Sequence, residues 1–215
     1  MKKITVKQLV LLAMLSAMAY VIVSVVRIPV ILFLKYEPKD VIITIGGFLL
    51  GPMAAFITSF VVSLLEMVTI SDTGPIGCLM NLISTCAFAC TAAVIYKRKH
   101  TLRGAVMGLA VGWIFMVAVM LLWNWLITPL YMGADRATVE AMLLPVFLPF
   151  NLLKGGLNSA IVLLLYKPLV TALRKTGLVE MSSGKKGNSK HGIYLLSAAL
   201  LITCIVLLLV LQGKM

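Results

Sequence analysis

Pro149-Phe150-Asn151-Leu152-Leu153-Lys154-Gly155-Gly156-Leu157-Asn158 lies in a run of apolar residues long enough to cross a bilayer. A lysine near the bilayer midplane costs about 2.5–3.5 kcal/mol, so its side chain has to face a partner or a wet cavity. Asn151, Lys154 and Asn158 are spaced i, i+3 and i+7, which places them on one face of a helix. This stretch predicts a membrane helix whose polar stripe points inward and could hold a small polar molecule.

The composition of the whole chain is that of a membrane protein. Of 215 residues, 61% are hydrophobic and 12% are charged, which does not describe a soluble core. The formal net charge of +12 could suggest a nucleic-acid partner. However, the basic residues cluster in short segments between apolar runs, and no aromatic residues are interleaved with them to stack on bases. Nucleic acid is therefore not an expected partner.

Seven apolar segments are predicted as helices of an all-α polytopic membrane protein. The second segment is too short to cross a hydrocarbon core of about 30 Å, so the residues before it should dip inward. Most Lys and Arg residues fall on the side of the N-terminus, which places that terminus in the cytoplasm of a multi-pass protein of the bacterial plasma membrane, surrounded by lipid. Loops 27–40, 71–75 and 130–144 are then external. The predicted segments are 8–26, 41–50, 52–70, 76–96, 104–129, 145–166 and 193–211.

The first external loop, residues 27–40, has a mixed character. Its start is too apolar for a solvated loop and its end is too charged for a helix core. Either it folds back over a cavity, with Phe33, Leu34 and Tyr36 covering a ligand, or it forms an interfacial hairpin that rests on lipid headgroups. The loop alone favours neither alternative.

Three asparagines are expected at a similar depth on three helices. Asn81 lies in the fourth segment, Asn124 lies between two tryptophans of the fifth, and Asn151 lies in the sixth. If the tryptophans meet lipid, Asn124 faces the bundle. Amide donors and acceptors from three helices suit a neutral heterocycle rich in carbonyl and NH groups. The alternative for the nearby Ser84 and Thr85, which we favour for these two, is hydrogen bonding between helices.

Glu66, near the outer end of the third segment, is an ionisable residue within the membrane and is a functional hypothesis by default. It could pair with Lys154, or lie just below the headgroups as a protonated acid. Pairing would allow a proton-coupled carrier, although one acid makes a poor relay.

Enzyme chemistry is not indicated. The four cysteines lie in apolar segments without Cys-x-x-Cys spacing, and His100 and His191 are isolated in loops, so no metal or haem site is expected. We find neither a nucleophile–base pair nor a phosphate-binding loop. The chain is therefore predicted to be no enzyme and to have no cofactor, and any ATP-driven work has to come from partner subunits.

Small residues recur at helical spacing in two segments. Gly104-x-x-x-Gly108-x-x-x-Gly112 permits close helix approach and is interpreted as packing inside the bundle. Ala13-x-x-x-Ala17 could serve the same purpose or could contact a partner protein.

Several of these segments together resemble one family. Phe33-Leu34-Lys35-Tyr36-Glu37-Pro38-Lys39-Asp40, Ile45-Gly46-Gly47-Phe48-Leu49-Leu50-Gly51-Pro52 and Pro149-Phe150-Asn151-Leu152-Leu153-Lys154-Gly155 are similar to the first loop, the second helix and the sixth helix of the riboflavin-specific S components of energy-coupling-factor (ECF) transporters. Ala13-x-x-x-Ala17 resembles the first-helix motif by which S components dock on the transmembrane T component. The resemblance covers about residues 5–175.

The resemblance implies a six-helix S-component bundle that captures riboflavin in an outward-facing pocket. Its partners would be the T component, docked through Ala13 and Ala17, and two ATP-binding subunits; riboflavin would be the transported substrate. The family's pocket maps onto Glu37, Asn124, Asn151 and Lys154. The predicted site residues are Leu34, Tyr36, Glu37, Asn81, Asn124, Asn151 and Lys154. An S component for another vitamin, a proton-coupled carrier using Glu66 and Lys154, and a structural membrane protein remain alternatives.

The chain departs from the family pattern at its C-terminal end. Residues 1–175 are predicted as the S-component transmembrane domain, residues 176–192 as a flexible cytoplasmic linker, and residues 193–215 as an additional transmembrane helix. Because the linker is rich in Gly, Ser and Lys, we expect this extra helix to be a loosely tethered anchor.

Overall fold

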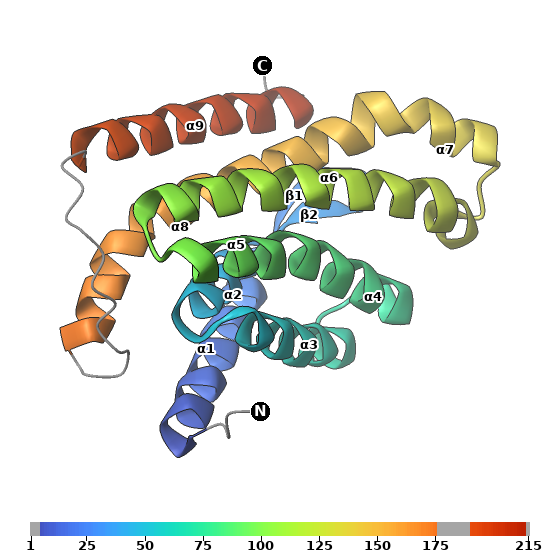
Figure 1. The fold of residues 1–215 in the computed structure, drawn as a ribbon. Coiled ribbons are helices and arrows are strands. Elements are labelled where there is room, and N and C mark those ends of the chain that lie inside the picture. Colours follow the sequence, from blue (N-terminus) through green and yellow to red (C-terminus); the bar gives the residue numbers. More distant parts are fainter. Residues whose placement is uncertain (1–4, 176–189, 214–215) are drawn as a thin grey trace.

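The computed structural model describes residues 5–175 and 190–213 and shows a helix bundle with one short β-hairpin (Figure 1). Two single π-helical turns, Cys86–Cys90 and Leu143–Phe147, join α4 to α5 and α7 to α8, so that each pair forms one continuous helical path. The elements are α1 (Val6–Val25), β1 (Ile28–Ile31), β2 (Leu34–Tyr36), α2 (Lys39–Leu50), α3 (Pro52–Thr69), α4 (Gly74–Thr85), α5 (Thr91–Lys99), α6 (Leu102–Met132), α7 (Arg136–Met142), α8 (Leu148–Lys175) and α9 (Lys190–Leu211).

Six helical segments within the described residues are long and apolar enough to cross a membrane: α1, α3, α4 with α5, α6, α7 with α8, and α9. The prediction of an all-α multi-pass bundle with an additional C-terminal helix is confirmed. The predicted short segment is also confirmed, because α2 has 12 residues and spans only about 18 Å at 1.5 Å per residue. α2 packs between α1, α3, α5 and α8.

Local sequence signals set several helix starts. Thr5 and Gln8 form a capping box at the start of α1, and the Thr101 hydroxyl accepts from the Gly104 N–H at the start of α6. Gly51 adopts φ 99°, a backbone conformation that favours glycine. The chain thus turns sharply from α2 into α3, whose first residue is Pro52.

The external loop predicted at residues 130–144 is wrong except at residues 133–135, because α6 continues to Met132. The helix begins at Arg136 and continues without a break through Leu143–Phe147 into α8. A π-turn accommodates an extra residue per turn, and Pro145 lies within this one. The proline marks the π-turn and not the start of the helix.

The first loop is a β-hairpin. β1 and β2 pair antiparallel, with an irregularity between Pro29 and Ile31, and Leu32 in the connecting turn has φ 50°. Val30, Leu34 and Tyr36 are buried against Phe147 and Phe150 of the α7–α8 path. The charged end of the loop is not a loop, because Lys39 and Asp40 form the first turn of α2 and are buried.

The glycine stripe of α6 packs inside the bundle, as predicted. A Cβ atom on Gly108 would lie 2.6 Å from the Ala92 carbonyl oxygen, and one on Gly112 would lie 2.6 Å from the Phe88 carbonyl oxygen. The α6 backbone can therefore touch α5 and the preceding π-turn only because these positions lack a side chain. Ala13 and Ala17 of α1 are instead exposed on the bundle surface.

The C-terminal helix lies along α8, on the far side of the bundle from α3 (Figure 1). Ser197 and Cys204 of α9 are buried. This helix therefore has a packed face that the Gly/Ser/Lys content of the preceding segment does not reveal. The loose tether stays a prediction. The predicted linker 176–192 lies mostly outside the described residues.

Candidate functional site

A cavity of about 240 Å³ opens between the hairpin and the ends of α4, α6 and α8. This volume lies slightly below the roughly 300–1,000 Å³ that is typical of small-molecule sites. The lining combines aromatic, thioether, amide and paired charged side chains: Arg27, Phe33, Leu34, Lys35, Glu37, Asp72, Thr73, Met80, Asn81, Ser84, Met120, Asn124, Tyr131, Phe150, Asn151 and Lys154. Such a lining fits a small molecule with an apolar body and several polar edges.

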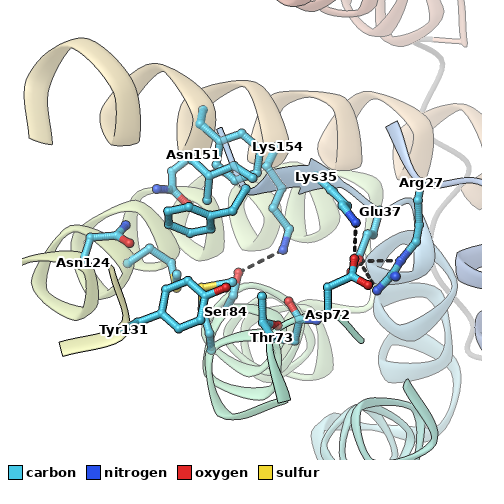
Figure 2. Close-up of a pocket in the computed structure, with 16 residues that line it drawn as sticks. Arg27, Lys35, Glu37, Asp72, Thr73, Ser84, Asn124, Tyr131, Asn151 and Lys154 are labelled. Carbon is cyan, nitrogen blue, oxygen red and sulfur yellow. Dashed lines mark hydrogen bonds and ion pairs between the residues drawn. The ribbon is translucent and has the colours of Figure 1, made fainter. Parts of the chain in front are cut away.

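The polar groups are divided between two ends of the cavity. Figure 2 shows the amides of Asn124 and Asn151 at one end, the charged groups of the hairpin at the other, and Lys154 between them. Phe33 of the hairpin and Tyr131 of α6 meet edge to face, with ring centroids 5.4 Å apart. The hairpin thus supplies an aromatic cover next to the amide end.

Asn124 is 1% exposed. Its Oδ1 accepts a hydrogen bond of 2.9 Å from the Thr128 hydroxyl one turn further along α6. Its Nδ2 has no partner among the described residues. A buried donor without an acceptor costs about 1–3 kcal/mol, so this amide at the cavity wall is prepared to donate to a ligand.

Lys154 is held by two side chains on other helices. Its Nζ lies 3.2 Å from the Ser84 Oγ of α4 and 3.3 Å from the Asp40 Oδ2 of α2. Asp40 also accepts from the Thr85 hydroxyl at 2.6 Å and from the Asn158 Nδ2 at 3.2 Å. The free-energy cost of placing the charged Lys154 within the membrane is thus offset by a carboxylate and a hydroxyl, while its ammonium group still reaches the cavity.

A second buried ionic cluster lies at the hairpin end. Lys39, fully buried, lies 2.8 Å from the Glu37 Oε2 and 2.6 Å from the Glu66 Oε1. Arg27 binds the Glu37 Oε1 at 3.0 Å and the Ile70 carbonyl oxygen. The hypothesis that Glu66 pairs with Lys154 is wrong, because Glu66 binds Lys39 and also accepts from the Asn81 Nδ2 at 3.0 Å.

An exposed ion pair ties the hairpin to the turn before α4. The Lys35 Nζ lies 2.5 Å from the Asp72 Oδ2. The hydrogen bond from Lys35 and its charge hold the pKa of Asp72 below its usual value of 3.8. The Asp72 carboxylate therefore stays ionised at neutral pH, and because the pair is exposed it adds little to stability.

Six of the seven predicted site residues line the cavity: Leu34, Glu37, Asn81, Asn124, Asn151 and Lys154. Tyr36 is the exception. Its side chain is buried beneath the hairpin and donates to the Asn158 Oδ1 at 3.0 Å. Asn158, the last residue of the predicted polar stripe, thus belongs to the support of Asp40 and not to the cavity wall. Trp125 also lies away from the cavity and donates to Glu140.

Sequence reasoning missed several contributors to this site. Ser84 bonds between helices as predicted, because it accepts from Lys154 of α8, but it also lines the cavity, which was not predicted. Lys39 and Asp40 were placed in a loop. The signal for these two was their position directly before a helix too short to span the membrane, since charges there lie at the depth where such a helix begins.

A bundle of apolar helices with a hairpin-covered polar cavity defines a membrane-embedded binding protein for a small molecule. A family model for the ECF transporter, substrate-specific component, matches residues 7–166. The chain therefore belongs to the substrate-specific components of ECF transporters, which are transporter subunits and not enzymes.

Curated relatives and a solved structure agree with this assignment. The chain is 30% identical to the riboflavin transporter RibU of Staphylococcus aureus (strain TCH60), over 79% of this chain and 93% of that protein. It is 26% identical to the riboflavin transporter FmnP of Bacillus subtilis (strain 168), over 75% and 90% of the two chains. A solved S component of a bacterial ECF transporter matches with a TM-score of 0.67 at 30% identity, over 78% of this chain and 98% of that one.

Proposed function

We propose that this chain captures riboflavin from outside the cell and serves as the substrate-binding subunit of an ATP-driven uptake transporter. Relatives that it matches over most of its length are named riboflavin transporters. The cavity chemistry supports the same substrate, since riboflavin has an apolar dimethylbenzene edge, a ring edge rich in carbonyl and NH groups, and a chain of hydroxyls.

The unpartnered Asn124 amide carries this proposal. It is buried at the wall of the cavity and lacks an acceptor among the described residues. A ring carbonyl or ring nitrogen of a flavin is an acceptor of the required kind. Asn151, whose Nδ2 donates to the Phe147 carbonyl oxygen at 2.8 Å, adds a second amide from the facing helix. The ring system would then lie beneath Phe33 and Tyr131.

The charges at the cavity favour an uncharged ligand over a phosphorylated one. Arg27 is bound by Glu37, Lys35 by Asp72 and Lys154 by Asp40. A phosphate would need donors free to bind it, and planar arginine donors do this best. With each cation at the cavity already paired, the hydroxyls of a ribityl chain fit the charged end better than a phosphate does.

The coupling to ATP hydrolysis is inferred from the membership of the chain in the ECF family. The T component would dock on α1, where Ala13 and Ala17 are exposed and leave the backbone accessible. Two ATP-binding subunits would supply the energy, with the N-terminus on their side of the membrane. Uptake of labelled riboflavin in cells should then require the T and ATP-binding subunits. Uptake without them would favour a secondary carrier.

The direct test is a titration of purified protein with riboflavin, followed by the fluorescence of the flavin. Stacking on aromatic side chains should quench the emission, and protein purified from riboflavin-containing medium should be yellow. Thiamine and folate serve as competitors that should not displace the flavin, and riboflavin phosphate should compete more weakly than riboflavin. An unquenched flavin and a colourless protein would overturn the proposal.

A further inference from the structure

The C-terminal helix α9 packs along α8 through one face. The Sγ of Cys204 would lie 2.6 Å from a Cβ atom built on Gly156 of α8, so the approach depends on that glycine. Cys204 is 5% exposed and Ser197 is fully buried. On the opposite face of α9, Leu195 and Ile202 are 75% and 63% exposed, as expected for side chains that meet lipid. α9 therefore has one face against the bundle and one face outward.

The end of α9 reaches the hairpin that covers the cavity. The Gln212 Nε2 donates to the Pro29 carbonyl oxygen of β1 at 2.7 Å. Leu207, Leu208 and Leu211 join the apolar cluster that contains Val30 and Leu34. Leu34 also lines the cavity. A helix at the C-terminal end of the chain thus touches the outer strand of a hairpin whose inner strand faces the candidate ligand site.

The hairpin depends on such neighbours. A two-stranded hairpin is at best marginally stable on its own in water. On the side of α4, this one is held by the exposed Lys35–Asp72 pair, which contributes little. On the other side of the hairpin, β1 contacts the last turns of α9. The family match ends at residue 166, so this support comes from a part of the chain outside the matched region.

We propose that α9 is a positioning element that holds the β1–β2 hairpin over the cavity and slows the release of the bound molecule, with Gln212 as the positioning residue at its tip. The expected effect of α9 on ligand release rests on the proposed function, the capture of riboflavin. Its effect on the hairpin itself does not depend on which ligand binds.

Two substitutions of Gln212 test the proposal in the full-length protein. Gln212→Met keeps the side-chain length and removes the donor, and Gln212→Lys restores a donor that can reach the Pro29 carbonyl oxygen. Ile202→Ala, on the outward face of the same helix, is the control. The two readouts are the amide hydrogen exchange of residues 30–36 without ligand, and the rate at which riboflavin fluorescence recovers when bound flavin is released.

We expect Gln212→Met to speed both exchange and release by about two- to tenfold, the effect of losing one hydrogen bond of typical net strength. Gln212→Lys should restore both rates, and Ile202→Ala should change neither. Unchanged exchange in Gln212→Met overturns the proposal, and so does faster exchange with unchanged release. If the parent protein binds no riboflavin, the proposed function fails, and the exchange measurement alone still decides whether α9 holds the hairpin.

Discussion

Replacing Asn124 with Ala should weaken riboflavin binding without unfolding the protein. In the ligand-free structure the Nδ2 of Asn124 has no partner among the described residues, and the Oδ1 accepts one hydrogen bond from Thr128. The substitution therefore removes one weak internal contact and an unsatisfied buried donor, so the stability of the free protein should change by less than about 1 kcal/mol.

The substitution should destabilise the complex with ligand more than it destabilises the free protein. Without the amide, a polar atom of the ligand is buried with no partner, which costs about 1–3 kcal/mol. At about 1.4 kcal/mol per factor of ten, the dissociation constant should rise by about 5- to 100-fold. Fluorescence titration of purified protein gives the dissociation constant, and thermal unfolding without ligand gives the stability.

Thr128→Val is the matched control for this substitution. It removes the same Thr128–Asn124 hydrogen bond but keeps the amide at the cavity wall. Its affinity should stay within about threefold of the parent value, the scale of a weak internal hydrogen bond. The reasoning is refuted if Asn124→Ala binds riboflavin as tightly as the parent protein, or if Thr128→Val weakens binding to the same extent.

Three other substitutions probe the supports of the cavity. Lys154→Ala should weaken riboflavin binding at least tenfold, which is about 1.4 kcal/mol. It should also lower the melting temperature, because Asp40 loses its cation. Adding Asp40→Asn should recover the stability but not the affinity. Lys39→Met leaves Glu37 and Glu66 buried without their shared cation and should lower the free energy of unfolding by about 3–5 kcal/mol, as followed by thermal unfolding. Adding Glu66→Leu should recover part of this loss. A Lys39→Met protein as stable as the parent would contradict the buried cluster. Gly155→Ala would place a Cβ atom 2.0 Å from the Trp113 ring and should destabilise the protein by about 1–3 kcal/mol, whereas Leu152→Ala, exposed on the same helix, should have a much smaller effect on the melting temperature.

The sequence predicts the helices of this protein well because the membrane imposes a simple length and polarity rule. The prediction fails where tertiary partners decide. Lys39 and Asp40 look like loop residues, since Glu37 is the one nearby residue that pairs with either of them. Their other charged partners, Glu66 and Lys154, come from α3 and α8, and only the folded bundle brings these groups within reach. A charge can be buried at a helix start when three helices share its neutralisation.

The site could be predicted because Lys154 is a charged residue within an apolar helix. A polar stripe in an apolar helix has few stable positions, and facing the cavity is one of them. The roles within the stripe were not predictable. Asn151 and Lys154 reach the cavity, whereas Asn158 supports Asp40 and Tyr36. The partners of Asn158 come from β2 and α2, and the sequence does not show that these elements lie against this turn of α8.

The buried ionic groups have an electrical consequence. The guanidinium of Arg27 and the ammonium groups of Lys39 and Lys154 face the carboxylates of Glu37, Asp40 and Glu66, so the formal charges of this set sum to zero. Moving one elementary charge through a potential of 100 mV involves about 2.3 kcal/mol. Because this set has no net charge, translating it as a whole along the membrane normal involves no such work. Binding of the proposed substrate riboflavin, which is uncharged, would leave this balance unchanged.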